Sequence, residues 1–208
     1  MKTAFFGGSF DPPHNGHLAV ARGALASGRC DRVLWVPAFA PPHKSTARRV
    51  PFELRMQMVE MLISGEEMMA VSDIEARLRR TPSYTIEILE QLEAETGDRP
   101  LLLIGNDSLK DFHRWHRCVE LAEKYEILSY PRREYPVDRD FLLQFWTPEN
   151  AEKLFSGMIP GKFFEISSTG IRNSMEKSPL TGNIKEMTEL PDEITAFIKA
   201  HGLYGAKQ

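Results

Sequence analysis

Short apolar runs alternate with longer helical stretches along most of this chain, and that alternation constrains the fold more than any other feature. Nearly continuous apolar runs predict buried strands at residues 2–8, 32–38, 68–73, 99–107 and 125–131. Between them, apolar residues recur at helical spacing and predict helices at residues 15–27, 51–63, 83–96 and 115–124. Strands that alternate with helices are joined by right-handed crossovers and form a parallel sheet. The pattern predicts an α/β fold of the Rossmann-like type, with helices on both faces of a parallel sheet.

The periodic pattern weakens after residue 132. Residues 132–162 contain aromatic side chains without a clean period, and we interpret them as an insertion or a small lobe. Residues 162–176 predict a short strand, a turn and the start of a helix. Residues 190–205 predict a small C-terminal helical part, with Pro191 near its start. We expect residues 1–208 to form one domain.

The composition is that of an ordinary globular protein, with 42% hydrophobic and 26% charged residues among 208. A net charge of −3 gives no overall attraction for nucleic acid, so a polyanionic ligand would need positive charge concentrated locally. Cys30 and Cys118 form no CxxC pair, and a disulfide framework is not expected. No apolar run reaches the roughly 20 residues that span a membrane. We expect a cytoplasmic protein without a membrane or nucleic-acid partner.

The loop after the first predicted strand, GGSFDPPHNGH at residues 7–17, places turn residues beside two histidines. Gly7 and Gly8 allow a sharp turn and the close approach of a ligand. His14 and His17 fall one turn apart at a helix start, where unpaired N–H groups and the helix dipole favour an anion. Three interpretations compete: a turn alone, half of a metal site, or a loop that holds a polyanion. The metal site is the weakest, because zinc needs three or four protein ligands and neither cysteine lies nearby.

A second polar motif, ISSTGIR at residues 166–172, lies far along the chain. Its hydroxyl side chains can cap a helix, and the guanidinium of Arg172, one turn further in, suits phosphate oxygens. The same stretch could also be an ordinary helix cap followed by a surface arginine. Its position in an α/β chain that also carries the histidine loop favours a functional role.

The two motifs together resemble the nucleotidyltransferase superfamily, whose HxGH element is here His14-Asn15-Gly16-His17. Members transfer a nucleotidyl group from a nucleoside triphosphate and release pyrophosphate. The resemblance implies that His14 and His17 contact the triphosphate, with His17 nearer the phosphorus under attack. It also implies that the backbone of Gly8, Ser9 and Phe10 passes beside the nucleotide, and that the β- and γ-phosphates are held by Ser168, Thr169 and Arg172.

Four further stretches resemble the bacterial nicotinate-nucleotide adenylyltransferase family: PAFAPPHK (37–44), PSYTIEILEQL (82–92), LLIGNDSLKDFHRWH (102–116) and LPDEITAFIKAHGLYG (190–205). The resemblance implies that Lys44 reaches a phosphate of ATP. It further implies that Gly105 and Asp107 meet the adenosine, with Asp107 accepting from ribose hydroxyls. Alternatives remain for both side chains, since Lys44 belongs to a basic run that could simply be solvated and Asp107 could cap a short helix.

The same resemblance implies a pocket for the acceptor mononucleotide. Tyr84 and Thr85 would lie by the nicotinate ring, and Trp115 would stack on it. Backbone N–H groups near Trp115 and His116 would bind the nicotinate carboxylate at a helix start. Tyr84 and Trp115 could instead be ordinary core residues. Residues 137–161 match no motif. They could form contacts in a homo-oligomer or a wall of the acceptor pocket.

The implied reaction is adenylyl transfer from ATP to nicotinic acid mononucleotide, giving deamido-NAD and pyrophosphate in NAD biosynthesis. Mg²⁺ would be carried by ATP, without a metal site of the protein's own. Nicotinamide mononucleotide is an alternative acceptor, and a catalytically silent nucleotide-binding regulator is a second alternative. Phosphopantetheine adenylyltransferases share the first motif but should lack the PSYT and GNDSLKDFHRWH stretches, and an aminoacyl-tRNA synthetase would need far more chain.

Overall fold

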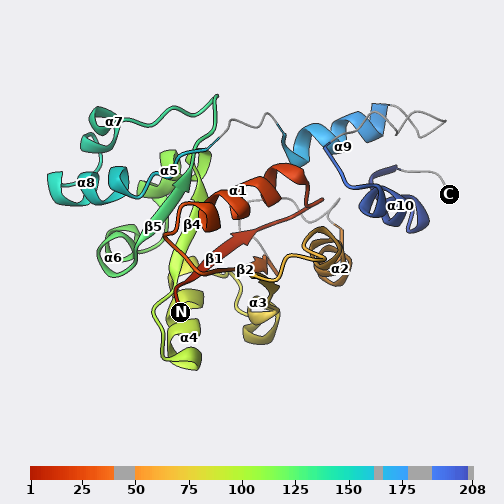
Figure 1. Ribbon diagram of the computed structural model, residues 1–208, viewed down its shortest axis with the longest axis horizontal. Coiled ribbons are helices and arrows are strands. Elements are labelled where there is room, and N and C mark those ends of the chain that lie inside the picture. The colour runs from red at the N-terminus through yellow and green to blue at the C-terminus, as the bar shows by residue number, and fades with distance from the viewer. Residues whose placement is uncertain (40–49, 162–165, 178–188, 206–208) are drawn as a thin grey trace.

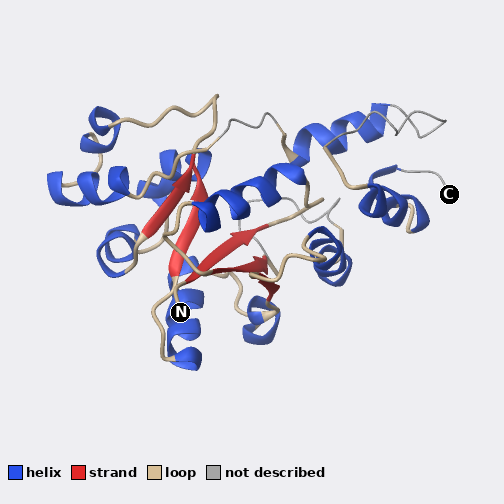
Figure 2. Cartoon of the chain, in the orientation of Figure 1, coloured by secondary structure: helices blue, strands red, loops and turns tan. Residues whose placement is uncertain are grey.

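A five-stranded parallel sheet forms the centre of the protein. The computed structural model describes residues 1–39, 50–161, 166–177 and 189–205. Within them the strands are β1 (Thr3–Gly8), β2 (Arg32–Pro37), β3 (Met69–Val71), β4 (Leu101–Gly105) and β5 (Ile127–Tyr130). They lie in the order β3-β2-β1-β4-β5, and every adjacent pair is parallel. The predicted parallel sheet is therefore confirmed (Figure 2).

The strand order places a topological switch point beside β1. From β1 the chain proceeds outward to β2 and β3, and then returns to add β4 on the other side of β1. Connections therefore leave the carboxyl ends of β1 and β4 in opposite directions. Ligands of such open sheets bind in the crevice that this divergence creates.

One face of the sheet is covered by α1 (Asn15–Ala26) and α2 (Phe52–Leu62). The hydrophobic core on this face continues beyond them into α9 (Ser168–Lys177) and α10 (Asp192–Ala200), and α10 packs against α2 (Figure 1). Alternate strand residues point into this core, as expected for a period of two. They include Ala4 and Phe6 of β1, Val33 and Trp35 of β2, and Leu101 and Leu103 of β4. The chain order thus brings the last two long helices back to the same face as the first.

The opposite face is covered by six helices, α3 (Ile74–Leu78), α4 (Thr85–Thr96), α5 (Asn106–Asp111), α6 (Cys118–Lys124), α7 (Arg139–Leu143) and α8 (Pro148–Ser156). The intervening strand residues, among them Phe5, Val36 and Leu102, pack against them. Burial on both faces explains why the strands read as continuous apolar runs instead of alternating ones.

Two element boundaries differ from the sequence-based expectation. β4 ends at Gly105, and α5 begins at Asn106 inside the stretch predicted as strand. The helix predicted from residue 115 begins only at Cys118. The backbone of Trp115 is extended, with φ −71° and ψ 153°, and Arg117 is left-handed with φ 53°. Both conformations are incompatible with a continuing right-handed helix.

Residues 132–161 contain two short helices that the sequence did not resolve. The Asp138 carboxylate accepts from the Phe141 amide at 2.8 Å and caps α7, and the Thr147 hydroxyl oxygen accepts from the Asn150 amide at 3.3 Å at the start of α8. Beyond α8 the chain returns to the sheet, where the Ser129 amide donates to the Gly157 carbonyl at 3.0 Å. These helices lie beside α6 and β5 at the left of Figure 1.

The C-terminal helix is confirmed as α10, which a short 3₁₀ turn, η4 (Leu203–Gly205), follows. The strand expected in residues 162–165 lies outside the described residues. None of the helices described is both long and apolar enough to cross a membrane.

Candidate active site

A cavity of about 230 Å³ lies at the carboxyl ends of β1 and β4, where the strand order reverses. Residues from the loop after β1, the first turns of α1 and α5, and the start of α9 all reach it. Its lining consists of Phe6, Gly7, Gly8, Ser9, Phe10, His17, Val20, Ile104, Gly105, Asp107, Ser108, Trp115, Arg132 and Ser168. The position is the one at which open parallel sheets bind their ligands.

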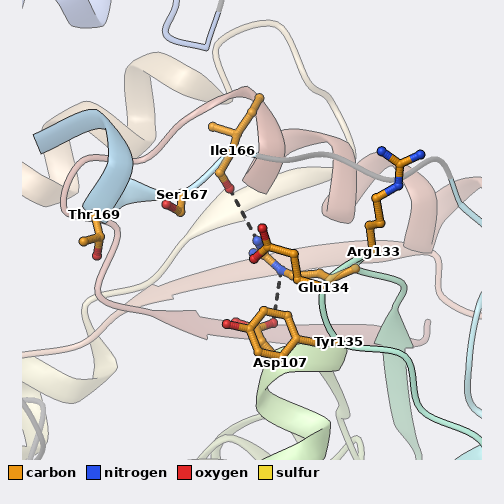
Figure 3. Close-up of a pocket in the computed structure, with 8 residues that line it drawn as sticks. Asp107, Arg133, Glu134, Tyr135, Ile166, Ser167 and Thr169 are labelled. Carbon is orange, nitrogen blue, oxygen red and sulfur yellow. Dashed lines mark hydrogen bonds and ion pairs between the residues drawn. The ribbon is translucent and has the colours of Figure 1, made fainter. Parts of the chain in front are cut away.

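A second cavity of about 300 Å³ shares Asp107 and Arg132 with the first. Figure 3 shows it between α5 and the segment that leads into α9. The two cavities therefore adjoin at Asp107 and Arg132. The remaining lining of the second cavity comes from Arg133, Glu134, Tyr135, Ile166, Ser167 and Thr169.

His14 and His17 lie together at the N-terminus of α1. The His14 amide donates to Nδ1 of His17 at 3.3 Å, and the two rings stack with centroids 3.7 Å apart and planes 27° apart. His17 lines the first cavity, and the ring of Phe10 meets it edge-on at 5.1 Å. Of the two histidines, His17 is therefore the one that lines the site.

His14 is 1% exposed, behind His17. Its Nδ1 is buried without a hydrogen-bond partner in the described structure, and the His17 amide donates to the His14 carbonyl at 2.9 Å. Burial, and secondarily the positive charge of Arg132, lower the pKa of His14 to about 3. His14 is therefore neutral near pH 7, with one N–H donor and one acceptor on its ring.

The loop after β1 turns so that its backbone faces the cavity. Phe10 has a left-handed φ of 45°, and its ring is buried against Phe6 and Trp35 at 5.4 and 5.1 Å. A Cβ at Gly8 would stand 2.9 Å from the Phe10 ring, so a larger residue there would push the ring or the loop aside. Gly8, Ser9 and Phe10 all line the cavity.

Arg55 of α2 is a site-supporting residue that the sequence-based reasoning missed. Its guanidinium is 1% exposed and donates to the carbonyls of Ser9 at 2.6 Å, Ala38 at 2.7 Å and Val50 at 3.1 Å. It thereby joins the loops that follow β1 and β2. A signal did exist: Arg55 is at the first position of an i, i+3, i+4, i+7 face that otherwise buries Met58, Val59 and Leu62.

The two distant motifs meet through hydrogen bonds. The Ser168 hydroxyl donates to the Pro12 carbonyl at 2.9 Å. The Arg172 guanidinium donates to the Asp11 carbonyl at 2.5 Å and to the Thr169 hydroxyl at 3.1 Å. Ser167 caps α9, since its hydroxyl oxygen accepts from the Gly170 amide at 3.1 Å. The start of α9 is thus fixed to the loop between β1 and α1.

Asp107 lies in the first turn of α5, just beyond the end of β4. It forms no helix cap there; its Oδ1 is 3.1 Å from Nε of Arg132, at ion-pair distance but without hydrogen-bond alignment. A Cβ at Gly105 would stand 2.3 Å from the same oxygen, so glycine lets the Asp107 carboxylate fold back beside the strand end. Nη1 of Arg132 donates to the Ile166 carbonyl at 3.4 Å (Figure 3). Arg132 therefore belongs to both cavities.

Of the four residues predicted for the acceptor, Trp115 alone lines the first cavity. Its ring meets that of Phe112 edge-to-face at 5.3 Å. Tyr84, at the start of α4, stacks on His116 with centroids 4.0 Å apart, and neither these two nor Thr85 lines the cavity itself. The Trp115 amide donates to the Phe112 carbonyl at 3.0 Å.

Lys44 lies outside the described residues. Within the described ranges, no group of three or more His, Cys, Asp or Glu side chains is placed to hold a metal ion.

Comparison with known proteins relates both the sequence and the fold to one group of enzymes. The family model described as cytidylyltransferase-like matches residues 5–174. The probable nicotinate-nucleotide adenylyltransferase of Gloeobacter violaceus is 35% identical over 98% of this chain and 96% of its own. The corresponding protein of Clostridium tetani is 32% identical over 98% of each.

Among solved structures, Plasmodium falciparum nicotinic acid mononucleotide adenylyltransferase complexed with NaAD superposes with a TM-score of 0.77. It covers 100% of this chain and 99% of its own at 19% identity, a likeness of fold. The sequence relatives are more than 30% identical over nearly full length. The chain therefore belongs to the nicotinate-nucleotide adenylyltransferase family.

Proposed function

We propose that this protein transfers the adenylyl group of ATP to nicotinic acid mononucleotide, giving deamido-NAD and pyrophosphate as a step of NAD biosynthesis. The observation that carries the proposal is the meeting of the HxGH turn and the ISSTGIR helix at one cavity, at the switch point of the sheet. Membership of the family supports the choice of reaction, and the stretches 82–92 and 102–116 support the choice of acceptor.

In the proposed complex the triphosphate of ATP lies along the N-terminus of α1. The positive end of the dipole of that helix favours the negative charge. Arg172, Ser168 and Thr169 hold the β- and γ-phosphates from the facing start of α9, and Lys44 adds a further cation. The adenosine extends past Gly105 toward the second cavity, where Asp107 accepts from its ribose hydroxyls.

The acceptor mononucleotide occupies the Trp115 end of the first cavity. The pyridine ring stacks on Trp115, a contact for which the flat indole face is suited. Tyr84 and Thr85 lie beyond it at the start of α4, and His116, stacked on Tyr84, closes that side. Because the Trp115 amide is already engaged by the Phe112 carbonyl, the nicotinate carboxylate is assigned to the amides that follow it, beginning with His116.

The reaction needs positioning more than acid–base chemistry. An oxygen of the acceptor phosphate attacks the α-phosphorus in line; its new P–O bond forms as the bond to the bridging oxygen of the β-phosphate breaks, and pyrophosphate leaves with that electron pair. A phosphate monoester is already ionised near neutral pH, so no general base is required. His17 donates to the phosphate oxygens as charge accumulates on them. We assign Mg²⁺ to the ATP substrate, since Mg²⁺ is commonly bound with few protein ligands.

Pyrophosphate release from ATP tests the proposal when nicotinic acid mononucleotide and nicotinamide mononucleotide are offered in turn. We expect release with the acid form at a clearly higher kcat/KM than with the amide form. The His17→Ala protein, purified identically, controls for contaminating activity. A preference for the amide form would contradict the acceptor assignment, and ATP binding without release with either acceptor would favour a silent regulator.

We further propose that the enzyme works in the cytoplasm on these small substrates, without nucleic acid or membrane. Its ordinary charge balance and its unpaired cysteines support that assignment. A homo-oligomer built with residues 137–161 remains a prediction that light scattering can test.

A further inference from the structure

The C-terminal end of the described chain reaches back to the loop between β1 and α1. In the η4 turn, the Tyr204 hydroxyl donates to Oδ1 of Asp11 at 2.5 Å, across 193 positions of sequence. The Asn15 amide, in the same loop region, donates to the Glu189 carbonyl at 2.9 Å just before α10. The segment that carries α10 and η4 is therefore tied at two points to the loop that lines the ATP site.

Asp11 connects this segment to the phosphate-binding arginine. Its side chain accepts from Tyr204, while its own carbonyl accepts from the Arg172 guanidinium at 2.5 Å. Asp11 is 7% exposed, so neither of these contacts is made in open solvent. A change in the orientation of this residue would move the carbonyl on which Arg172 depends.

We propose that Tyr204 is a positioning residue for ATP: its hydrogen bond to Asp11 fixes the Asp11 peptide, and through that carbonyl it orients Arg172 toward the triphosphate. The inference rests on the proposed function insofar as Arg172 binds the β- and γ-phosphates. It adds a residue from the η4 turn that lines neither of the two cavities.

The local structure suits a fixed connection. Tyr204 has a left-handed φ of 56°, a conformation that a bulky side chain adopts only where its surroundings hold it. Burial, together with the neighbouring Asp11, raises the pKa of the Tyr204 hydroxyl, so it keeps its proton and remains a donor across the working pH range. Nη2 of Arg172 donates to the Thr169 hydroxyl, and Nη1 donates to the Asp11 carbonyl of the loop between β1 and α1.

Equilibrium binding of ATP and of AMP to Tyr204→Phe tests the proposal, because only ATP carries the phosphates that Arg172 would hold. We expect the Kd for ATP to rise about tenfold, which corresponds to about 1.4 kcal/mol, while the Kd for AMP stays unchanged. Tyr125→Phe is the matched control, since the Tyr125 hydroxyl also donates to a carboxylate, Glu93 at 3.2 Å, on the opposite face of the sheet. It should bind both nucleotides as the wild type does.

A double-mutant cycle with Arg172→Ala separates positioning from a general effect on folding. If Tyr204 acts through Arg172, Tyr204→Phe should cost ATP affinity in the wild-type background and nothing further in the Arg172→Ala background. Asp11→Ala approaches the same contact from its other side, so it keeps the test decisive if Tyr204→Phe is poorly folded, and it should reproduce the selective loss for ATP. Equal weakening of ATP and AMP, additive losses, or wild-type affinity in Tyr204→Phe would each overturn the inference.

The outcome of this experiment is separable from that of the proposed function. A protein that binds ATP with the expected Tyr204 dependence but adenylates neither mononucleotide would retain the positioning role and lose the acceptor assignment. If the wild-type protein bound no ATP, both the positioning role of Tyr204 and the proposed function would be refuted.

Discussion

The rings of His14 and His17 are stacked 3.7 Å apart, and only the outer ring, His17, lines the cavity. The buried ring, that of His14, is neutral, and the backbone amide of His14 donates to Nδ1 of His17. The two histidines of the HxGH element thus differ in position, with His14 buried and His17 facing the cavity. Gly16 makes the arrangement possible, because a Cβ there would stand 3.0 Å from the His14 ring and 3.3 Å from Ile166.

His17→Ala should lower turnover at least about tenfold, which corresponds to about 1.4 kcal/mol of activation free energy. The imidazole is expected to donate to phosphate oxygens whose charge grows in the transition state, so the loss should fall mainly on kcat. Steady-state pyrophosphate release measures it. His201→Ala is the matched control, because His201 is exposed and contacts the Phe197 carbonyl in the last turn of α10. If the kcat of His17→Ala were within a factor of about two of the wild-type value, His17 would not take part in the catalytic step.

His14 should make the stability of the protein depend on pH. Its pKa is lowered from 6.5 to about 3 in the folded state, so between these values the unfolded chain binds a proton that the folded chain does not. The free energy of unfolding should therefore fall as the pH falls through this window, by at most about 1.4 kcal/mol per pH unit. Above pH 6.5 the contribution is fully present and constant.

Urea unfolding from about pH 7 to about pH 4, with wild type and His14→Asn in parallel, measures this dependence. The variant should lose the part of the slope that His14 causes. Comparison of the two proteins is needed because Glu75 has a pKa raised by burial, which stabilises the folded state as the pH falls and so acts in the opposite direction. Parallel slopes for the two proteins would show that His14 does not titrate as described.

Much of this architecture could be predicted from local pattern. Continuous apolar runs located all five strands, because burial on both faces leaves no room for polar alternation. The HxGH and ISSTGIR motifs indicated the loops that meet at the candidate site, because loops at strand ends and helix starts are where a sheet of this kind binds anions. Pattern failed where structure is short or set by a single residue. The five-residue helix α7 is too short to show a period. The left-handed backbone of Arg117 prevents α6 from beginning before Cys118.

The contacts that assemble the site could not be predicted from the sequence pattern, for a different reason. The bond from Arg172 to the Asp11 carbonyl joins a side chain to a backbone atom 161 positions away. Every residue has a backbone carbonyl, so the sequence does not reveal which carbonyl accepts from the Arg172 guanidinium. The same holds for the three backbone carbonyls that accept from the Arg55 guanidinium.

Arg55→Met should be strongly destabilising although Arg55 touches no substrate. The change removes the donor shared by three carbonyls, and leaving such buried acceptors unpaired costs about 1–3 kcal/mol each before any relaxation. We expect a loss of about 3 kcal/mol or more in the free energy of unfolding, measured in urea. Arg22→Met is the control: Arg22 forms an exposed ion pair with Glu66, and its loss should cost less than about 1 kcal/mol. Similar losses in the two variants would refute the structural role of Arg55.

Gly105→Ala should weaken ATP binding without unfolding the protein. The backbone at Gly105 has φ −85°, which alanine adopts freely, so the added methyl group acts only through its contacts. Its Cβ would stand 2.3 Å from Oδ1 of Asp107 and 3.1 Å from Nε of Arg132, and both side chains would have to move out of the place where the ribose is expected. We expect the Kd for ATP to rise about tenfold by calorimetry, with the urea midpoint nearly unchanged. In an Asp107→Ala background, where the methyl group meets no carboxylate, the same substitution should cost little further affinity; an undiminished second loss would mean that Gly105 acts on the nucleotide directly and not through Asp107.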